Sequence, residues 1–308
     1  MTFPSTDEKH TIYAEIYTPK TEAPRAVIQL AHGMVDHAGR YKLLAEYLTG
    51  KGYIFAGHHH LGHGKSVSSP DEFGYFADKG GVNFLLRDMH RFNRYLRDEY
   101  APLPVIVFGH SMGSFITRLY IERYPHSIKG AVIHGTAGKN PALPLGRILS
   151  KIIQKTHRQH HRSKLVNDLA FGAYNSAFPK EGTRAWLSRD PELAEEMDEY
   201  IGFLFTASGY CDLFKMLAQC NRQDWYDHYP IRMPTLIMSG TADPVGGKNA
   251  KGPKEVCEGL VAAGCTDITL KLYDGARHEL FRETNRDEVF ADLGAWLDGV
   301  TDRLKNEN

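Results

Sequence analysis

The sequence predicts an α/β fold with a mostly parallel, doubly wound sheet and a helical segment inserted near the middle of the chain. Short apolar runs alternate with longer segments of helical periodicity, and this alternation stops over residues 139–222 and then resumes. Strands that helices cover on both faces are apolar almost throughout, so such runs are typical of a parallel sheet. The 308 residues are 42% hydrophobic and 24% charged, as in an ordinary globular protein.

The expected elements can be given in chain order. Residues 11–16 alternate between apolar and more polar side chains, as in a strand with one buried face. Nearly continuous apolar runs then predict buried strands at 26–30, 53–56, 105–108, 130–133, 235–238 and 268–272. Helical spacing predicts helices over 41–51, 82–100, 115–124, 254–263 and 288–303. Strand twist makes the crossovers between parallel strands right-handed.

The interruption at residues 139–222 indicates an insertion. It holds helical and irregular stretches with scattered aromatic residues, but no convincing buried strand. We expect it to form a helical cap, or lid, over the carboxyl edge of the sheet, while residues 1–138 and 223–308 form the core domain. The alternative is that these residues are further helices of the core.

Composition disfavours several classes of function. Lys+Arg and Asp+Glu both number 37, so the basic excess typical of nucleic-acid binding is missing and no nucleic-acid partner is expected. No run of about 18 apolar residues predicts a transmembrane helix, and residues 1–20 lack the apolar core of a signal peptide, so we expect a cytoplasmic location. No cysteine pair has C-x₂-C spacing, which predicts four free thiols: Cys211, Cys220, Cys257 and Cys265.

The strongest chemical motif is the G-x-S-x-G sequence at 109–113. It follows the expected strand 105–108 and opens a segment with helical spacing. In a sharp strand-to-helix turn the serine takes up a strained backbone conformation that exposes its hydroxyl, and the glycines avoid collisions with neighbouring elements. This position predicts that Ser111 is a nucleophile, whereas the same motif in an ordinary loop would be a chance match.

A serine hydroxyl needs a base, and histidine is the usual base because its pKa is near neutrality. The chain has 16 histidines, so position must decide among them. His278 follows strand 268–272 and Asp243 follows strand 235–238, which places both at the edge where open α/β sheets assemble their sites. We expect His278 to be the base and Asp243 to orient it. Asp274 and Glu279 compete for that second role, but they would lie beside the last strand and in the segment after it.

The tetrahedral oxyanion of such a reaction needs preorganised hydrogen-bond donors. The backbone N–H of Met112, directly after the serine, is one candidate. The second is the N–H of Met34, in the turn that closes the strand 26–30, where Gly33 lets the backbone approach the site.

These motifs resemble the monoacylglycerol lipase and lysophospholipase group of α/β-hydrolases, which is grouped with the serine aminopeptidase-like fold. The matching blocks lie in the family's order at 32–41, 60–66, 109–113, 239–243 and 278. The resemblance implies an α/β-hydrolase fold with a helical cap. It also implies a catalytic triad of Ser111, Asp243 and His278 and an oxyanion hole formed by the N–H groups of Met34 and Met112.

The favoured interpretation is a serine carboxylic-ester hydrolase that works through an acyl-enzyme, with no cofactor and no metal ion. Its partner would be a small or medium acyl ester, such as a monoacylglycerol or a lysophospholipid. The expected substrate-binding residues are Gly33, His110, Phe203 and Phe205, although the two phenylalanines could equally form the cap's own core. Peripheral lipid contact through the cap is a further expectation. For the basic run at 157–162, a solvated helix face is favoured over a surface for anionic lipid or a phosphorylated substrate.

The chain departs from the family's usual pattern at His59, where an aspartate is usual. The run His58-His59-His60 suggests a metal site, because imidazole is a common ligand. Adjacent residues of an extended chain point to opposite faces, however, so the three rings cannot easily converge. We expect instead an altered hydrogen-bond partner beside the active-site loops, at a modest cost in stability.

Two other functions stay open. An aminopeptidase of the same fold would need an acidic group in the cap to hold the substrate's amine, and the candidates are Glu192, Glu195, Glu196, Asp198 and Glu199. A non-catalytic ligand-binding protein on a hydrolase scaffold would be expected to lack a member of the triad, and none is missing. Dehalogenases and epoxide hydrolases are disfavoured because they carry aspartate in place of Ser111.

Overall fold

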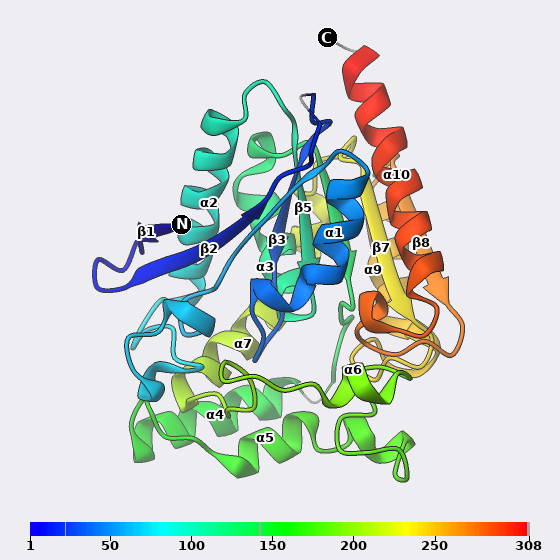
Figure 1. Ribbon diagram of the computed structural model, residues 1–308. Helices are drawn as coiled ribbons and strands as arrows, with labels where there is room; N and C mark the ends of the chain where they lie inside the picture. The colour runs from blue at the N-terminus through cyan, green and yellow to red at the C-terminus, as the bar shows by residue number, and fades with distance from the viewer. Residues whose placement is uncertain (22, 142, 307–308) are drawn as a thin grey trace.

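A twisted sheet runs through the centre of the computed structural model, which describes residues 1–21, 23–141 and 143–306 (Figure 1). Within them it has eight strands in the order β1-β2-β4-β3-β5-β6-β7-β8. Their bounds are β1 (Thr2–Pro4), β2 (Thr11–Tyr17), β3 (Val27–Ala31), β4 (Ile54–His58), β5 (Val105–His110), β6 (Gly130–His134), β7 (Thr235–Gly240) and β8 (Ile268–Tyr273). Only β1 and β2 pair antiparallel with their neighbours, so the predicted mostly parallel sheet is confirmed.

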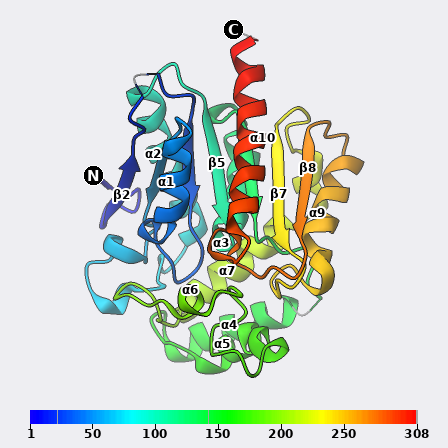
Figure 2. The same ribbon diagram turned by 45° about the vertical axis from the view of Figure 1, so that its right-hand side comes forward.

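Helices cover both faces of the sheet, as Figure 2 shows. One face packs against α1 (Lys42–Gly50) and α10 (Arg286–Asn306), and the other against α2 (Gly81–Glu99), α3 (Met112–Arg123) and α9 (Lys251–Ala262). Because side chains alternate along a strand, Ile106 and Phe108 of β5 enter the first core while Val107 enters the second. This double cover explains why the strands read as apolar runs.

The order of the strands reverses between β3 and β5. The chain builds outward from β3 to β4 on one side and from β5 to β8 on the other. At such a switch point the loops after the two central strands turn to opposite faces and leave a crevice at the carboxyl edge. Ser111 follows β5 and the segment 32–34 follows β3, so both lie at this crevice.

The segment 139–222, which we call the cap segment, lies below the carboxyl edge of the sheet in Figure 1. Its described part, 139–141 and 143–222, contains no strand and has α4 (Leu143–His157), α5 (Lys164–Phe171), α6 (Pro191–Glu195) and α7 (Ala207–Cys220). Residue 142 in this segment, and 307–308 at the end of the proposed core, lie outside the described residues. The short helix α8 (Gln223–Asp227) leads back toward β7. We retain the division into core and cap as a proposal.

Arg118 of α3 joins the two ends of the cap segment. Its fully buried guanidinium donates to the carbonyl of Ala137 (3.1 Å), before the segment, and to that of Cys220, at the segment's end. The group also lies over the ring of Trp225, 4.3 Å from its centroid. No ion pair to Arg118 occurs among the described residues, so carbonyl oxygens and an aromatic face compensate the buried charge.

We predict that Arg118→Met lowers the free energy of unfolding by about 2–4 kcal/mol, because buried carbonyl groups lose their charged donor. Urea denaturation measures this change. The control is Arg123→Met on the same helix, where the side chain is exposed and the change should stay within about 0.5 kcal/mol. A loss for Arg118→Met no larger than that of the control would show that the junction does not depend on this contact.

Candidate active site

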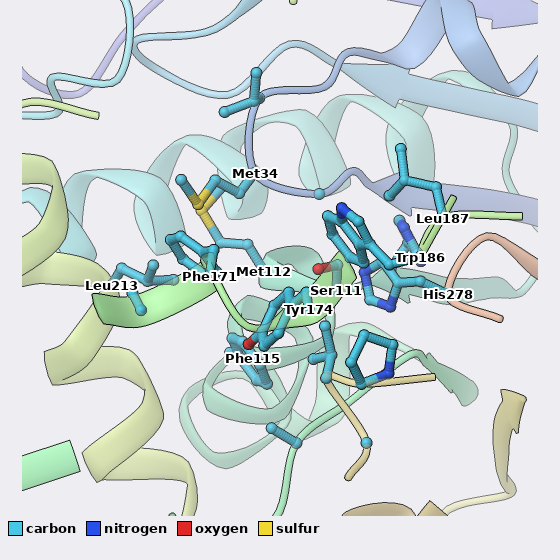
Figure 3. Close-up of a pocket in the computed structure, with 18 of the residues that line it drawn as sticks. Met34, Ser111, Met112, Phe115, Phe171, Tyr174, Trp186, Leu187, Leu213 and His278 are labelled. Carbon is cyan, nitrogen blue, oxygen red and sulfur yellow. The ribbon is translucent and has the colours of Figure 1, made fainter. Parts of the chain in front are cut away.

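Ser111 lies in a sharp turn between β5 and α3. Its backbone angles are φ 52° and ψ −119°, a region that residues with a side chain rarely occupy. A Cβ atom at Gly113 would lie only 1.9 Å from the carbonyl oxygen of Ala31, so α3 crosses the end of β3 at a distance that only glycine permits. The turn presents Ser111 to a cavity of about 540 Å³ that residues of both the core and the cap segment line (Figure 3).

His278 and Asp243 form a buried pair beside this cavity. The Nδ1 atom of His278 lies 3.0 Å from both carboxylate oxygens of Asp243, and both residues are buried. Of the competing acids, Asp274 accepts a hydrogen bond from the hydroxyl of Thr241, and Glu279 pairs with Arg40. The structure therefore brings His278 to the carboxylate that follows β7.

The pairing with Asp243 determines the direction in which the pKa of His278 shifts. Burial lowers the pKa of the imidazole, but Asp243, with smaller contributions from Glu279 and Asp36, outweighs it and raises that pKa above 6.5. Since the Nδ1–H donates to Asp243, the Nε2 atom is left to accept a proton.

Ser111 and His278 both line the cavity, as Figure 3 shows. Within the described residues the serine hydroxyl makes no hydrogen bond to His278 in this conformation. Such bonds are often long in the absence of a ligand and tighten when substrate binds. Gly135, at φ +60°, leaves room for the imidazole, because a Cβ atom there would lie 3.0 Å from Cε1 of His278.

Met34 and Met112 both line the cavity, and their backbone N–H groups have no acceptor among the described residues. The loop that carries Met34 is held by Asp36, which accepts hydrogen bonds from the N–H of Gly33 (3.2 Å) and from the hydroxyl of Tyr41 (2.7 Å). Asp36 is buried, and although burial raises the pKa of its carboxyl, Arg40 and the hydrogen bonds lower it overall. Sequence reasoning missed this role, although Asp36 lies in one of the blocks that carry the family resemblance.

The cap segment supports His278, which sequence reasoning also missed. The ring of Trp186 packs 5.1 Å from the imidazole, and its carbonyl accepts from the backbone N–H of His278 at 3.4 Å. The next carbonyl, that of Leu187, accepts from the N–H of Glu279 at 2.7 Å. His278 is thus held between its own loop and a segment about ninety residues earlier in the chain. No local sequence signal announces this contact.

The expected substrate-binding residues divide into two groups. Gly33, His110 and Phe203 line the cavity. The prediction for Phe205 is wrong, since this residue is fully buried and packs edge-on against Phe76, 5.5 Å between ring centroids, instead of lining the cavity. Phe205 therefore fits neither alternative: it packs between the cap segment and the core, with His63 and Phe76 on one side and Tyr210 on the other.

None of the five acidic cap residues proposed to hold an amine lines the cavity. Glu196 pairs with Arg282, Asp198 with His37, and Glu195 accepts from the hydroxyl of Thr183. Glu192 and Glu199 are exposed. The carboxylates that do line the cavity are Asp36, Glu255 and Glu279. The aminopeptidase alternative therefore does not find its amine site among these five residues.

Of the three consecutive histidines, His58 and His60 contact each other, with Nε2 and Nδ1 3.2 Å apart, and the backbone N–H of His60 donates to Nε2 of His32 (2.9 Å). Burial lowers the pKa of His32, His58 and His60, so these rings are neutral and brace the ends of β3 and β4. His59 has other partners: its Nδ1 accepts from the N–H of Lys65 (2.9 Å), and its Nε2 lies 3.4 Å from a carboxylate oxygen of Glu15. The altered hydrogen-bond partner expected for His59 stays a prediction.

The basic run at 157–162 lies mostly on the surface, in line with a solvated face. Arg162 differs from its neighbours: it is half-buried and donates to backbone carbonyls of the core, including that of Phe73 at 2.7 Å. It therefore ties the cap to the core.

The chain is similar to known proteins over most of its length. A family profile described as Serine aminopeptidase, S33 matches residues 22–285. The monoacylglycerol lipase of Mycolicibacterium smegmatis is 29% identical over 93% of this chain and 92% of its own, and human monoglyceride lipase is 27% identical over 91% and 85%. Among solved structures, a thermostable carboxyl esterase from Bacillus coagulans in complex with glycerol superposes with a TM-score of 0.89 at 26% identity, covering 98% of both chains.

We predict that the ring of His278 titrates above pH 6.5, and that Asp243→Asn lowers its pKa because burial then acts without the carboxylate. NMR titration of labelled histidine side chains measures both values. The raised pKa also means that this pair stabilises the fold below pH 6.5, and that the contribution is lost as pH rises through the folded pKa.

The matched control for this titration is Asp274→Asn, whose carboxylate contacts Thr241 instead of His278. It should leave the midpoint of His278 where it is in the wild type. An unchanged midpoint in Asp243→Asn would show that the pair does not set the charge of the ring.

Proposed function

The chain belongs to the Serine aminopeptidase, S33 family of α/β-hydrolases. From its similarity to monoacylglycerol lipases and a carboxyl esterase within this fold, we propose that it cleaves acyl esters with Ser111 as the nucleophile. It is a hydrolase of the serine hydrolase type, similar to monoacylglycerol lipases and carboxyl esterases. The observation that supports the proposal best is the buried His278–Asp243 pair next to a strained serine at one cavity.

In the proposed mechanism, the Oγ atom of Ser111 attacks the ester carbonyl while Nε2 of His278 takes its proton. The C–O bond to the alcohol then breaks, and His278 returns the proton to the departing oxygen. A water molecule, deprotonated by His278, hydrolyses the acyl-enzyme in the second half of the reaction. Asp243 stabilises the imidazolium, and the N–H groups of Met34 and Met112 are placed to bind the oxyanion. These steps need water and no cofactor.

We propose a small or medium acyl ester, such as a monoacylglycerol or a lysophospholipid, as the substrate. The cavity volume lies in the range of small-molecule sites, and much of its wall is apolar. Figure 3 shows Met34, Phe171 and Leu213 on one side of Ser111, with Phe115 and Tyr174 below it. This apolar side suits the acyl chain.

The cap carries exposed apolar residues that favour peripheral contact with lipid. On α4 they recur at helical spacing beside lysines, and on the neighbouring α5 there are two more. We call Leu145, Ile148, Ile152, Leu165 and Leu169 the cap apolar face; each is more than half exposed. An exposed apolar surface with cationic neighbours is the composition that binds at a membrane interface. No helix in the described chain has the length and apolarity to span a membrane.

We predict that a fluorophosphonate probe labels the wild type and fails to label Ser111→Ala. The same variant should lose ester turnover by about 10⁶-fold, the scale seen when a catalytic nucleophile is removed. p-Nitrophenyl esters of increasing acyl length, assayed beside aminoacyl p-nitroanilides, report turnover and separate an esterase from an aminopeptidase.

The control for this experiment is Ser114→Ala. The hydroxyl of Ser114 donates to the carbonyl of Ser111 and does not line the cavity, so labelling should persist. Labelling of Ser111→Ala would place the nucleophile elsewhere, and faster cleavage of anilides than of esters would favour the peptidase.

We predict that Ile148→Ser combined with Ile152→Ser weakens binding to vesicles of phosphatidylcholine and phosphatidylglycerol by at least about tenfold. The reason is that the variant lacks two apolar side chains that would be buried in the membrane interface. Vesicle co-sedimentation measures the partition. Val261→Ser on α9, which removes an equally exposed apolar side chain, is the control and should not change it. If the double variant bound vesicles as strongly as the wild type, the cap apolar face would be excluded as the membrane contact.

A further inference from the structure

Arg184 places a cation without an ion-pair partner in the wall of the cavity. The residue is half-buried, and it lines the same space as Ser111 and His278. Among the residues that the structure describes, its guanidinium has neither a carboxylate within ion-pair distance nor a hydrogen-bond acceptor. Glu195, a neighbouring acid of the cap, accepts from the backbone N–H of Arg184 instead (2.9 Å). A half-buried arginine in this state has its full donor capacity available to a ligand.

The other charged groups of the cavity are paired or exposed. Arg40 forms a two-pronged pair with Glu279 (3.1 and 3.2 Å) and also contacts Asp36. On another part of the rim, Lys251 pairs with Glu255 (3.7 Å), whose carboxylate also accepts from the backbone N–H of Lys139 (3.2 Å). The side chain of Lys139 is exposed to solvent, so it does not carry the cost of burial that Arg184 carries.

Arg184 has no carboxylate in contact with its guanidinium among the described residues. Burial, and then the positive charge of Arg40, lower its pKa, and the smaller attraction of the more distant Glu195 and Glu279 does not offset them, while the group stays a cation at neutral pH. An anion bound in the cavity would offset both the desolvation of the guanidinium and its repulsion by Arg40.

The position of Arg184 in the site indicates which part of the substrate it would contact. The leaving alcohol must depart next to His278, because this residue gives it a proton. Arg184 lies two residues before Trp186, whose ring packs against the imidazole. Figure 3 shows Trp186, Leu187 and His278 on one side of Ser111 and the apolar residues Met34, Phe171 and Leu213 on the other. The charges of Arg40 and of Glu279, the residue that follows His278, act on Arg184, which assigns Arg184 to the alcohol side of the site.

We propose that Arg184 is a specificity-determining residue that binds an anionic group on the alcohol portion of the ester. The inference rests on the proposed esterase function and narrows its substrate class to acyl esters of a phosphorylated or carboxylated alcohol. A planar guanidinium can donate two parallel hydrogen bonds to either anion, and such charge-assisted bonds are strong in a partly desolvated site. The contact is separate from the reacting carbonyl, so it acts on substrate choice.

The test compares three esters with one acyl chain, each below its micelle concentration: 1-octanoylglycerol, 1-octanoylglycerol 3-phosphate and 3-O-octanoylglycerate. The measured quantity is kcat/KM for each anionic ester divided by that for the neutral one. We expect at least one of these ratios to exceed about ten in the wild type, and to fall as salt is added, because ions screen the attraction. The salt titration needs no variant, so it stays informative if a substitution disturbs folding.

The variants are Arg184→Ala, Arg184→Lys and Arg184→Glu. Arg184→Ala should lower the ratio by about 10- to 100-fold, the usual worth of a hydrogen-bonded ion contact. Arg184→Lys should keep part of the preference for the anionic ester, and Arg184→Glu should lower the ratio furthest. The control is Arg232→Ala, an exposed arginine in the loop before β7, at the opposite end of the strand from the site, which should leave the ratio unchanged.

The outcomes separate the proposals. An Arg184-dependent ratio for the phosphate ester alone, the glycerate alone or both supports the inference and identifies the anion. Ratios near one, or ratios that do not change in Arg184→Ala and Arg184→Glu, overturn it while leaving the esterase function intact. A wild type that cleaves none of the esters and is not labelled at Ser111 contradicts the proposed function itself.

Discussion

The close crossing of α3 over the end of β3 is the constraint on which the site depends. Because Gly113 has no side chain, the start of the helix reaches the carbonyl of Ala31, and the turn before it forces Ser111 into its strained conformation. The same approach brings the N–H groups after Ser111 and after Gly33 to one cavity. Backbone packing thus positions the proposed nucleophile and its candidate oxyanion donors, and side-chain contacts have no part in this.

The parts of the site that local patterns determine were predictable from the sequence. Buried parallel strands are recognisable as apolar runs, and the residues just beyond their carboxyl ends must meet at one edge. Asp243 and His278 were chosen for that reason, and the structure brings their side chains into contact. β1 escaped notice because three residues, one of them Pro4, carry no periodic signal.

The cap could not be predicted in the same way. Its helices pack through tertiary contacts that no spacing encodes. The burial of Phe205 between the cap segment and the core, and the packing of Trp186 on His278, therefore became visible only in the structure. The acidic residues expected to face the substrate illustrate the same point, because arginines and hydroxyls elsewhere in the fold hold several of them. Charge in a sequence does not reveal which partner a side chain finds.

The joining of the cap's two ends has a consequence for how such enzymes diversify. Asn221 donates to the carbonyl of Gly138 (3.2 Å), so the chain leaves the core and returns to it at the same place. Arg118 donates hydrogen bonds to carbonyls at both ends of the segment. An insertion whose ends already meet imposes no length on what lies between them. Evolution or design can therefore replace the whole segment with one of different size and specificity. The replacement must restore the contacts by which Trp186 and Leu187 hold the loop of His278.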